Sequence, residues 1–123
     1  MDYKFFDSVG PLRGLKGSLY EGGIRVPLIV RWPGKVKAGS VSDVLTGFED
    51  WLPTILDLTG AKADLPAGID GVSLAPVLLG KAKRGEGGRD FLYREFAAYG
   101  GQQSVYLNGG KWKAIRQNLM SLG

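Results

Sequence analysis

The sequence contains no cysteine and no histidine, and these two absences restrict its chemistry more than any other feature of its composition. Without cysteine, the chain has no disulfide framework, no zinc–thiolate site and no cysteine nucleophile. Without histidine, it lacks the commonest general base and the commonest transition-metal ligand. A histidine-dependent catalytic triad or a zinc hydrolase site therefore cannot be assembled from these 123 residues alone.

Long apolar runs and the common catalytic loop motifs are also missing. No run approaches the roughly 18 apolar residues that a membrane helix requires, and residues 1–6, MDYKFF, contain no apolar signal-peptide core. Neither a phosphate-binding P-loop nor a GxSxG nucleophile elbow is present. We therefore expect no membrane partner, and the sequence leaves the compartment unassigned.

What the chain does have is glycine and a basic C-terminal third. The 20 glycines are about twice the usual share of roughly 7%, and their irregular spacing predicts many short elements joined by tight turns. Residues 81–123 carry 8 basic and 3 acidic side chains, whereas residues 1–80 carry 8 and 9. The basic part either faces an anionic partner or forms an ordinary solvated surface, and the second interpretation is the simpler one.

The first two thirds of the chain have the pattern of an α/β protein. Residues 24–32 predict a strand buried on both faces, as in the centre of an α/β sheet, because a β-branched apolar run lies between turn signals. Residues 50–59 predict a helix with Asp50 as its N-cap and Gly60 at its C-terminal end. Residues 73–79 predict a second, shorter helix.

The last third changes to a period of two. Residues 81–90 are polar and rich in glycine, which is typical of a linker. Beyond them, we expect three antiparallel strands, with a hairpin turn at residues 108–110, Asn-Gly-Gly. Three strands with one apolar face need a cover, and the chain ends too soon to supply a full covering helix. We therefore expect the chain to be a piece of a longer protein, and an α+β arrangement when taken by itself.

Acidic residues do not form a convincing metal site. Asp43, Glu49 and Asp50 come nearest to a cluster, but helix capping explains Asp50 better, so no metal ligands are predicted. Glu21 and Arg25 lie four residues apart, and we favour a structural role in which they pair with each other or hold the surrounding loop.

The residue with the clearest chemical potential is Lys16, which lies in a glycine-rich loop just before the predicted central strand. An ammonium is a compact charge with three donors, and it suits an oxyanion such as sulfate or phosphate. On composition alone, an ordinary surface lysine is the simpler interpretation.

A resemblance to a known family changes that interpretation. Residues 11–27, PLRGLKGSLYEGGIRVP, resemble the second signature of the type I sulfatases, the arylsulfatase-like enzymes that depend on formylglycine. The resemblance covers nearly the whole chain. It continues through short strings that match the family in order: WPG at 32–34, SD at 42–43, DxxPT at 50–54, DGxSL at 70–74, LYxEF at 92–96 and GKWKAxR at 110–116.

The resemblance implies a role for Lys16, because the matching lysine of the family contacts the sulfate group of the substrate. We therefore expect Lys16 to be both a catalytic and a substrate-binding residue. Family members hydrolyse sulfate esters with a formylglycine made in a Cys/Ser-x-Pro-x-Arg motif, and they bind one calcium ion. This chain has no such motif, so the resemblance implies that formylglycine and calcium belong to the full-length parent and that this chain holds no cofactor.

Two residues depart from the family pattern. Arg94 replaces the usual tryptophan, and Tyr106 stands where an arginine commonly precedes the GKWK turn. Both departures put fine substrate contacts from the small C-terminal subdomain in doubt.

The predicted organisation follows the resemblance. Residues 1–80 would be the end of the large mixed-sheet catalytic α/β domain, residues 81–90 a linker, and residues 91–123 a truncated antiparallel subdomain. We expect a C-terminal fragment of a sulfuric ester hydrolase, inactive by itself, whose parent acts on a sulfate ester and whose exposed apolar surface favours self-association. Nucleic acid is not an expected partner. The alternative is a stand-alone basic module, in which residues 111–113 bind sulfated glycan or nucleic acid. Family members are often exported, but the compartment stays unknown.

Overall fold

The computed structural model describes residues 5–61, 65–82 and 86–121. Residue contacts divide the chain into two compact units, which we describe separately. The loop-and-sheet unit comprises Met1–Leu28, Tyr93–Leu107 and Lys111–Gly123. The two-helix unit comprises Ile29–Leu92 and Asn108–Gly110. The predicted boundaries at residues 80 and 90 concern the full-length enzyme and stay a prediction, and residues 83–85 of the predicted linker lie outside the described residues.

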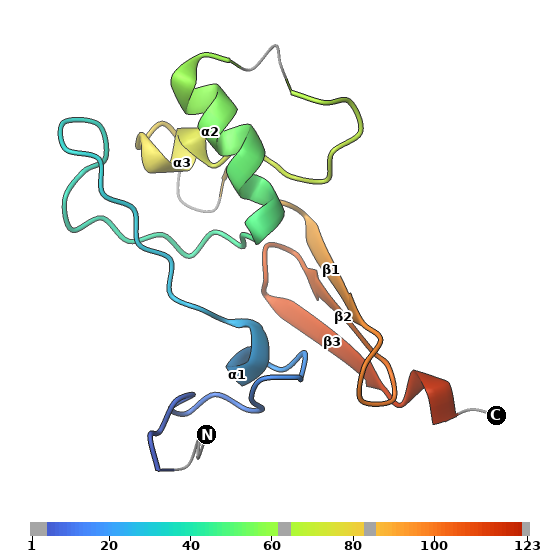
Figure 1. Cartoon of the computed structure of the whole chain (residues 1–123). Helices are drawn as coiled ribbons and strands as arrows, with labels where there is room; N and C mark the ends of the chain where they lie inside the picture. Colours follow the sequence, from blue (N-terminus) through green and yellow to red (C-terminus); the bar gives the residue numbers. More distant parts are fainter. Residues whose placement is uncertain (1–4, 62–64, 83–85, 122–123) are drawn as a thin grey trace. The chain divides into compact units, whose positions relative to one another are not determined.

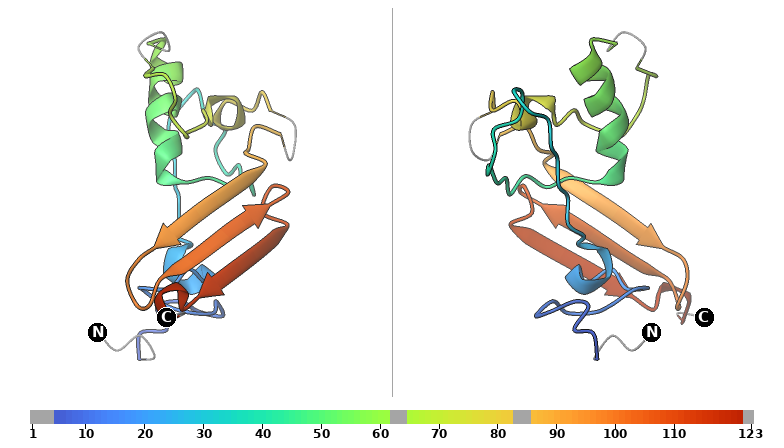
Figure 2. Two further views of the ribbon diagram at one scale, coloured as in Figure 1. Left: turned by 90° about the vertical axis from the view of Figure 1, so that its right-hand side faces the viewer. Right: turned by 60° about the vertical axis from the view of Figure 1, so that its left-hand side comes forward.

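A three-stranded antiparallel sheet forms the regular part of the C-terminal third (Figure 1). Its strands are β1 (Phe91–Phe96), β2 (Gln102–Leu107) and β3 (Trp112–Gln117), in the spatial order β1-β2-β3. The β2 and β3 strands pair in register from Gln102 opposite Gln117 to Leu107 opposite Trp112. Both views of Figure 2 show the three strands side by side.

The hairpin turn has the backbone that its sequence predicts. Asn108 and Gly109 have φ angles of 54° and 63°, in the left-handed region that asparagine and glycine tolerate best. This turn connects β2 to β3. The predicted three strands and the predicted hairpin are therefore confirmed.

One face of β2 is buried although it is polar. Gln102, Ser104 and Tyr106 are exposed to only 4%, 3% and 8%, and they alternate with the half-buried Gln103 and Val105. Alternate residues of a strand point to the same side of a sheet. This buried side of β2 carries hydrogen-bonding groups, and the N-terminal loop supplies partners for Gln102 and Tyr106, as described below.

The predicted strand at residues 24–32 is not formed. The short helix α1 (Glu21–Ile24) takes the start of this segment, and Arg25 N–H closes its turn on Glu21 O at 2.8 Å. Residues 25–32 have no regular structure, and Val26 and Ile29 are exposed to 61% and 88%. A strand buried on both faces requires partner strands for its backbone groups, and no strand in the described part of the chain pairs with this segment.

The described residues of the two-helix unit include three helical segments. They are the 3₁₀-helix η1 (Phe48–Asp50), the helix α2 (Trp51–Thr59) and the short helix α3 (Ala75–Leu78). Gly60 ends α2 with a left-handed φ of 79°, as predicted. The 3₁₀-helix η3 (Leu119–Ser121) follows β3 at the end of the chain. None of the helices in the described ranges has the length and apolar character needed to cross a bilayer.

Polar contacts join α2 to the segment that leads into α3. Leu74 N–H donates to Thr54 Oγ1 at 2.9 Å, and Ser73 Oγ donates to Asp57 Oδ2 at 2.7 Å. Thr54 Oγ1 also donates to the backbone oxygen of Asp50 at 2.5 Å. Thr54 and Asp57 lie three residues apart, on the same face of the helix. That face therefore binds the connecting segment through hydrogen bonds.

Asp50 has a different role from the predicted one. It occupies the N-cap position of α2, but its carboxylate makes no capping bond to that helix. Oδ2 accepts from Gly47 N–H at 2.8 Å and from Thr46 Oγ1 at 3.1 Å, while Oδ1 accepts from Val72 N–H at 2.9 Å. Oδ1 also accepts from Arg89. The carboxylate therefore joins three separate segments of the two-helix unit.

At the level of fold class, the chain is a mixed α/β arrangement of a small antiparallel sheet and a few short helices, as predicted for the isolated piece.

Candidate functional site

Lys16 lies at the corner of a tight turn in the loop-and-sheet unit. Ser18 N–H donates to Leu15 O at 3.0 Å, which closes a four-residue turn with Lys16 and Gly17 at its centre. Gly17 has φ +91°, so the turn needs glycine at this third position. The Lys16 side chain is exposed. The turn therefore presents an ammonium at the surface on a short, defined backbone.

Close packing gives a second reason for glycine in this loop. A Cβ on Gly17 would lie 2.7 Å from the Tyr99 ring, and a Cβ on Gly22 would lie 2.2 Å from Gly14 O. Gly22 N–H also donates to Arg13 O at 2.8 Å. The glycines thus let the loop fold back on itself and approach the Tyr99 ring. This agrees with the adaptable backbone that the sequence predicts.

The buried face of β2 holds the loop on both sides of Ser18. Gln102 Nε2 donates to Gly17 O at 3.0 Å, and Leu19 N–H donates to Gln102 Oε1 at 3.3 Å. Leu19 is itself buried, with 5% exposed. One side-chain amide therefore satisfies a carbonyl and an N–H of the loop at the same time.

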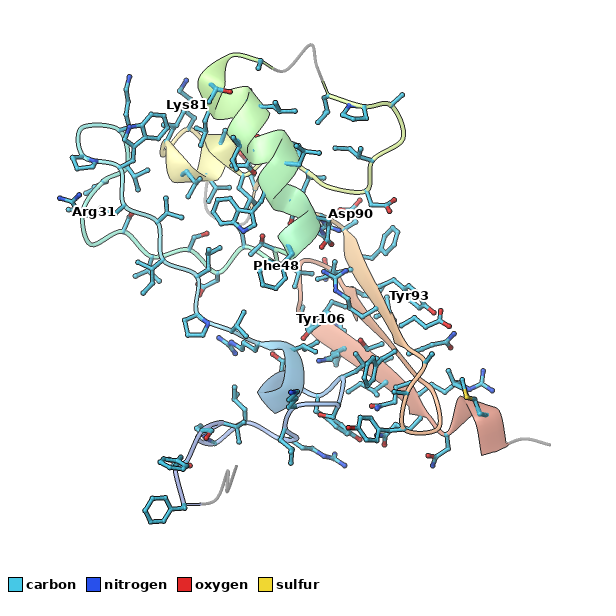
Figure 3. The ribbon with its side chains drawn as sticks, viewed as in Figure 1. Arg31, Phe48, Lys81, Asp90, Tyr93 and Tyr106 are labelled. Atoms are coloured by element: carbon cyan, nitrogen blue, oxygen red, sulfur yellow. The ribbon has the colours of Figure 1, made fainter. Side chains whose placement is uncertain are left out.

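Glu21 makes the second attachment between loop and sheet. Its Oε1 accepts from Lys113 Nζ at 2.7 Å and from Tyr106 Oη, and Lys113 Nζ donates to Tyr106 Oη at 2.8 Å. Tyr106 is labelled on the sheet in Figure 3. The predicted loop-holding role of Glu21 is confirmed, but its ion-pair partner is Lys113 on β3 instead of Arg25.

These contacts shift two pKa values in opposite directions. Burial tends to raise the pKa of Glu21, but the hydrogen bonds from Lys113 and Tyr106 and the charges of Lys113 and Arg25 together lower it below its ordinary 4.5. Burial, the hydrogen bond to Glu21 and the charge of Glu21 raise the pKa of Tyr106 well above its ordinary 10.0. At a pH between the lowered pKa of Glu21 and the raised pKa of Tyr106, Glu21 is thus ionised and Tyr106 neutral.

We expect a pH-dependent stability difference between the wild-type chain and Glu21→Gln. A carboxylate whose pKa is lower in the folded state stabilises the fold above its unfolded pKa near 4.5, and this contribution disappears as the pH falls through the lower folded value. Wild type should therefore be the more stable at pH 7, and the difference should shrink below about pH 4. Urea unfolding of both chains at pH 3 to 8 measures it. A difference that stays constant down to pH 3 would contradict the assignment.

Arg13, a second cation close to this turn, contacts an aromatic ring, unlike Lys16. The Arg13 guanidinium lies 4.1 Å from the centroid of the Tyr20 ring, and Tyr20 Oη donates to Gln117 Oε1 at 3.3 Å. Within the described ranges, Lys16 makes no hydrogen bond or ion pair. Its ammonium is therefore exposed and available for an external anion.

No ligand set for a metal ion accompanies Lys16. Across residues 5–61, 65–82 and 86–121, no group of three or more His, Cys, Asp or Glu side chains is placed to hold one. Asp50, a member of the acidic group considered from sequence, has both oxygens bound by protein donors. The described residues therefore do not fit the calcium ion that the family resemblance implies.

The role predicted for Lys16 stays a prediction, and nothing in the sequence pointed to Gln102. The structure brings Gln102 to the backbone just after Lys16 and joins Tyr106 to Glu21 of the same loop. The available signal was the alternation of Gln102, Ser104 and Tyr106 on one strand, which reads as a solvated face because all three can hydrogen-bond. Tyr106, seen first as a departure from the family pattern, has a defined partner in Glu21.

Comparison with known proteins finds sulfatases. The family model described as N-sulphoglucosamine sulphohydrolase, C-terminal, matches residues 14–118. The chain is 41% identical over 110 residues to mouse steryl-sulfatase, covering 88% of this chain and 17% of that protein. It is 38% identical over 90 residues to N-acetylglucosamine-6-O-sulfatase of Bacteroides thetaiotaomicron, covering 73% and 16%. It is 45% identical over 75 residues to bovine arylsulfatase A, covering 60% and 14%.

The match begins inside the Lys16 loop and includes all three strands. The chain spans only about a sixth of the length of these curated relatives. Both the loop and the sheet that holds it thus fall within one recognised unit of sequence, and the chain belongs to the family of C-terminal sulfatase domains.

Proposed function

We propose that this chain is the C-terminal part of a sulfuric ester hydrolase and that Lys16 contacts the sulfate group of its substrate. The observation that carries the proposal is an exposed, unpaired ammonium on a loop that two sheet contacts hold, within a domain of the sulfatase family. The family resemblance supplies the substrate class, a sulfate ester.

The proposed role of Lys16 is electrostatic. A sulfate ester carries negative charge on its sulfuryl oxygens, and more charge develops on the leaving oxygen as the ester bond breaks. An ammonium held at a fixed position offsets that charge more effectively than water, which would have to reorient during the reaction. The turn at Leu15–Ser18 supplies such a position, because its backbone is fixed by hydrogen bonds.

The nucleophile and metal of the reaction are proposed to lie in other parts of the full-length enzyme. Sulfatases of this type use a formylglycine nucleophile and a calcium ion, and the sequence of this chain contains no Cys/Ser-x-Pro-x-Arg motif. We also propose that residues 1–80 complete the large α/β domain and that residues 91–123 form the small subdomain. In that setting the apolar segment 24–32 would gain the strand partners that it lacks here.

The alternative, a basic module that binds sulfated glycan or nucleic acid, has less support. It relies on the hairpin residues 111–113. Lys113, however, is committed to Glu21 at 2.7 Å, and its ammonium also lies 4.4 Å from the centroid of the Tyr106 ring. An ammonium already neutralised by a carboxylate attracts a polyanion weakly, so the hairpin loses much of its proposed charge.

We expect this chain alone to show no turnover of 4-nitrophenyl sulfate above the uncatalysed rate. The full-length enzyme that contains it should turn the ester over, because it adds the formylglycine motif and the calcium site. The matched control is the same full-length protein with the formylglycine precursor replaced by alanine. Clear, enzyme-dependent release of 4-nitrophenol by the isolated chain would overturn the division of function proposed here.

A further inference from the structure

We propose that Gln102 is a positioning residue for Lys16, which fixes the direction in which the ammonium leaves the loop. The inference rests on the proposed function of Lys16 and assigns a second residue to the same site. Gln102 does not contact substrate in this proposal. It acts only through the backbone of the turn.

The Gln102 side-chain amide makes two hydrogen bonds to the loop. They reach the carbonyl of Gly17 and the N–H of Leu19, the first and third residues after Lys16. A primary amide can donate and accept at once in a fixed plane. Since Gln102 is exposed to only 4%, water cannot easily replace either bond. The two peptide units on either side of Ser18, which follow Lys16 and Gly17 in the chain, are therefore held in one orientation.

The position of Lys16 depends on that orientation, because the backbone of the turn is flexible at Gly17. Gly17 has φ +91°, and as a glycine it can reach many other backbone conformations. Without the Gln102 bond, the Gly17 carbonyl is held by no other hydrogen bond in the described residues. Rotation about Gly17 would displace Lys16, and a misplacement of about 1 Å at a catalytic group can cost on the order of 10²-fold in rate.

The second attachment of the loop, at Glu21, makes it possible to distinguish a positioning role of Gln102 from a role in folding alone. Glu21 is bound to Tyr106 and Lys113 four residues beyond Gly17, through contacts that do not involve Gln102. Loss of the Gln102 bonds should thus leave the loop attached to the sheet, while it releases the Gly17 carbonyl and the Leu19 N–H from the sheet and leaves the turn that carries Lys16 held only by its own bond from Ser18 to Leu15. This geometry predicts an effect on catalysis that depends on the presence of the Lys16 side chain.

The test is a double-mutant cycle in the full-length enzyme that contains this chain, with 4-nitrophenyl sulfate as the probe. Gln102→Met keeps the side-chain size and removes both hydrogen bonds, and we expect it to lower kcat about 10- to 100-fold. In a Lys16→Ala background the same substitution should have almost no further effect. Gln103→Met, on the opposite face of β2, is the matched control and should leave kcat unchanged.

The outcomes separate this inference from the proposed function. A similar loss from Gln102→Met in both backgrounds, or no loss in either, would overturn the positioning role. If Lys16→Ala itself left kcat unchanged, the proposed function would fail first and the positioning role with it. If Gln102→Met does not fold, Gln102→Glu replaces it. Protonated glutamic acid can donate to Gly17 O and accept from Leu19 N–H, so its kcat relative to wild type should recover as the pH is lowered. Absence of recovery would overturn the inference.

Discussion

Replacing Lys16 with alanine is expected to lower kcat for sulfate ester hydrolysis by about 10²- to 10³-fold in the full-length enzyme that contains this chain. The negative charge of the sulfate group and of the leaving oxygen would lose one nearby ammonium, which water replaces poorly. The free energy of unfolding should stay within about 0.5 kcal/mol of wild type, because the Lys16 side chain is exposed and makes no hydrogen bond or ion pair with the described residues. Steady-state kinetics and urea unfolding measure the two effects.

Lys35→Ala is the matched control for this prediction. Lys35 is also an exposed lysine beside a glycine turn, in the segment that begins at Trp32. Its removal should change neither kcat nor stability. Lys16→Arg keeps the charge but not the compact ammonium, so it should retain part of the activity that alanine loses. Wild-type kinetics for Lys16→Ala would remove this residue from the sulfate site.

Local signals in the sequence predicted the parts of the fold that depend on neighbours along the chain. The Asn108–Gly110 turn fixes its own backbone and brings two adjacent strands together, so the hairpin follows from a few residues. The end of α2 at Gly60 follows in the same way from one left-handed glycine. The role of Lys16 stays a prediction that rests on its motif, because spacing within one loop is visible in the sequence.

The features that the sequence predicted wrongly or did not reveal depend on distant partners. The apolar run at residues 24–32 predicts burial, but the sequence cannot supply the strands that would pair with it, and in this chain it has none among the described residues. Gln102 binds Leu19 across 83 residues, and Arg89 reaches Asp50 across 39. Buried polar side chains look like surface residues in a sequence, because only the fold decides whether a donor meets an acceptor.

The second large effect is expected on stability, at the buried carboxylate of Asp50. Asp50→Ala should lower the free energy of unfolding of this chain by about 3–5 kcal/mol, because it removes the fully buried partner of Arg89 and leaves that largely buried guanidinium with the partly exposed Glu49 as its ionic partner. Asp50 is 0% exposed and the Arg89 side chain 11%. Three further donors, from Thr46, Gly47 and Val72, lose their acceptor in the same variant. Urea unfolding followed by circular dichroism measures the change.

Two further variants decide whether that loss comes from breaking the Asp50–Arg89 ion pair. Asp70→Ala removes an exposed aspartate two residues before Val72 and should change stability by less than about 0.5 kcal/mol. In the double variant of Asp50→Ala with Arg89→Met, both charges are gone, so the loss should be clearly smaller than the sum of the two single losses. Glu49, 3.1 Å from Arg89, is partly exposed and keeps access to water, so it should not reverse this result. Additive losses would show that Asp50 stabilises the two-helix unit through its bonds from Thr46, Gly47 and Val72 alone, and the large effect would then belong to these hydrogen bonds instead of the ion pair.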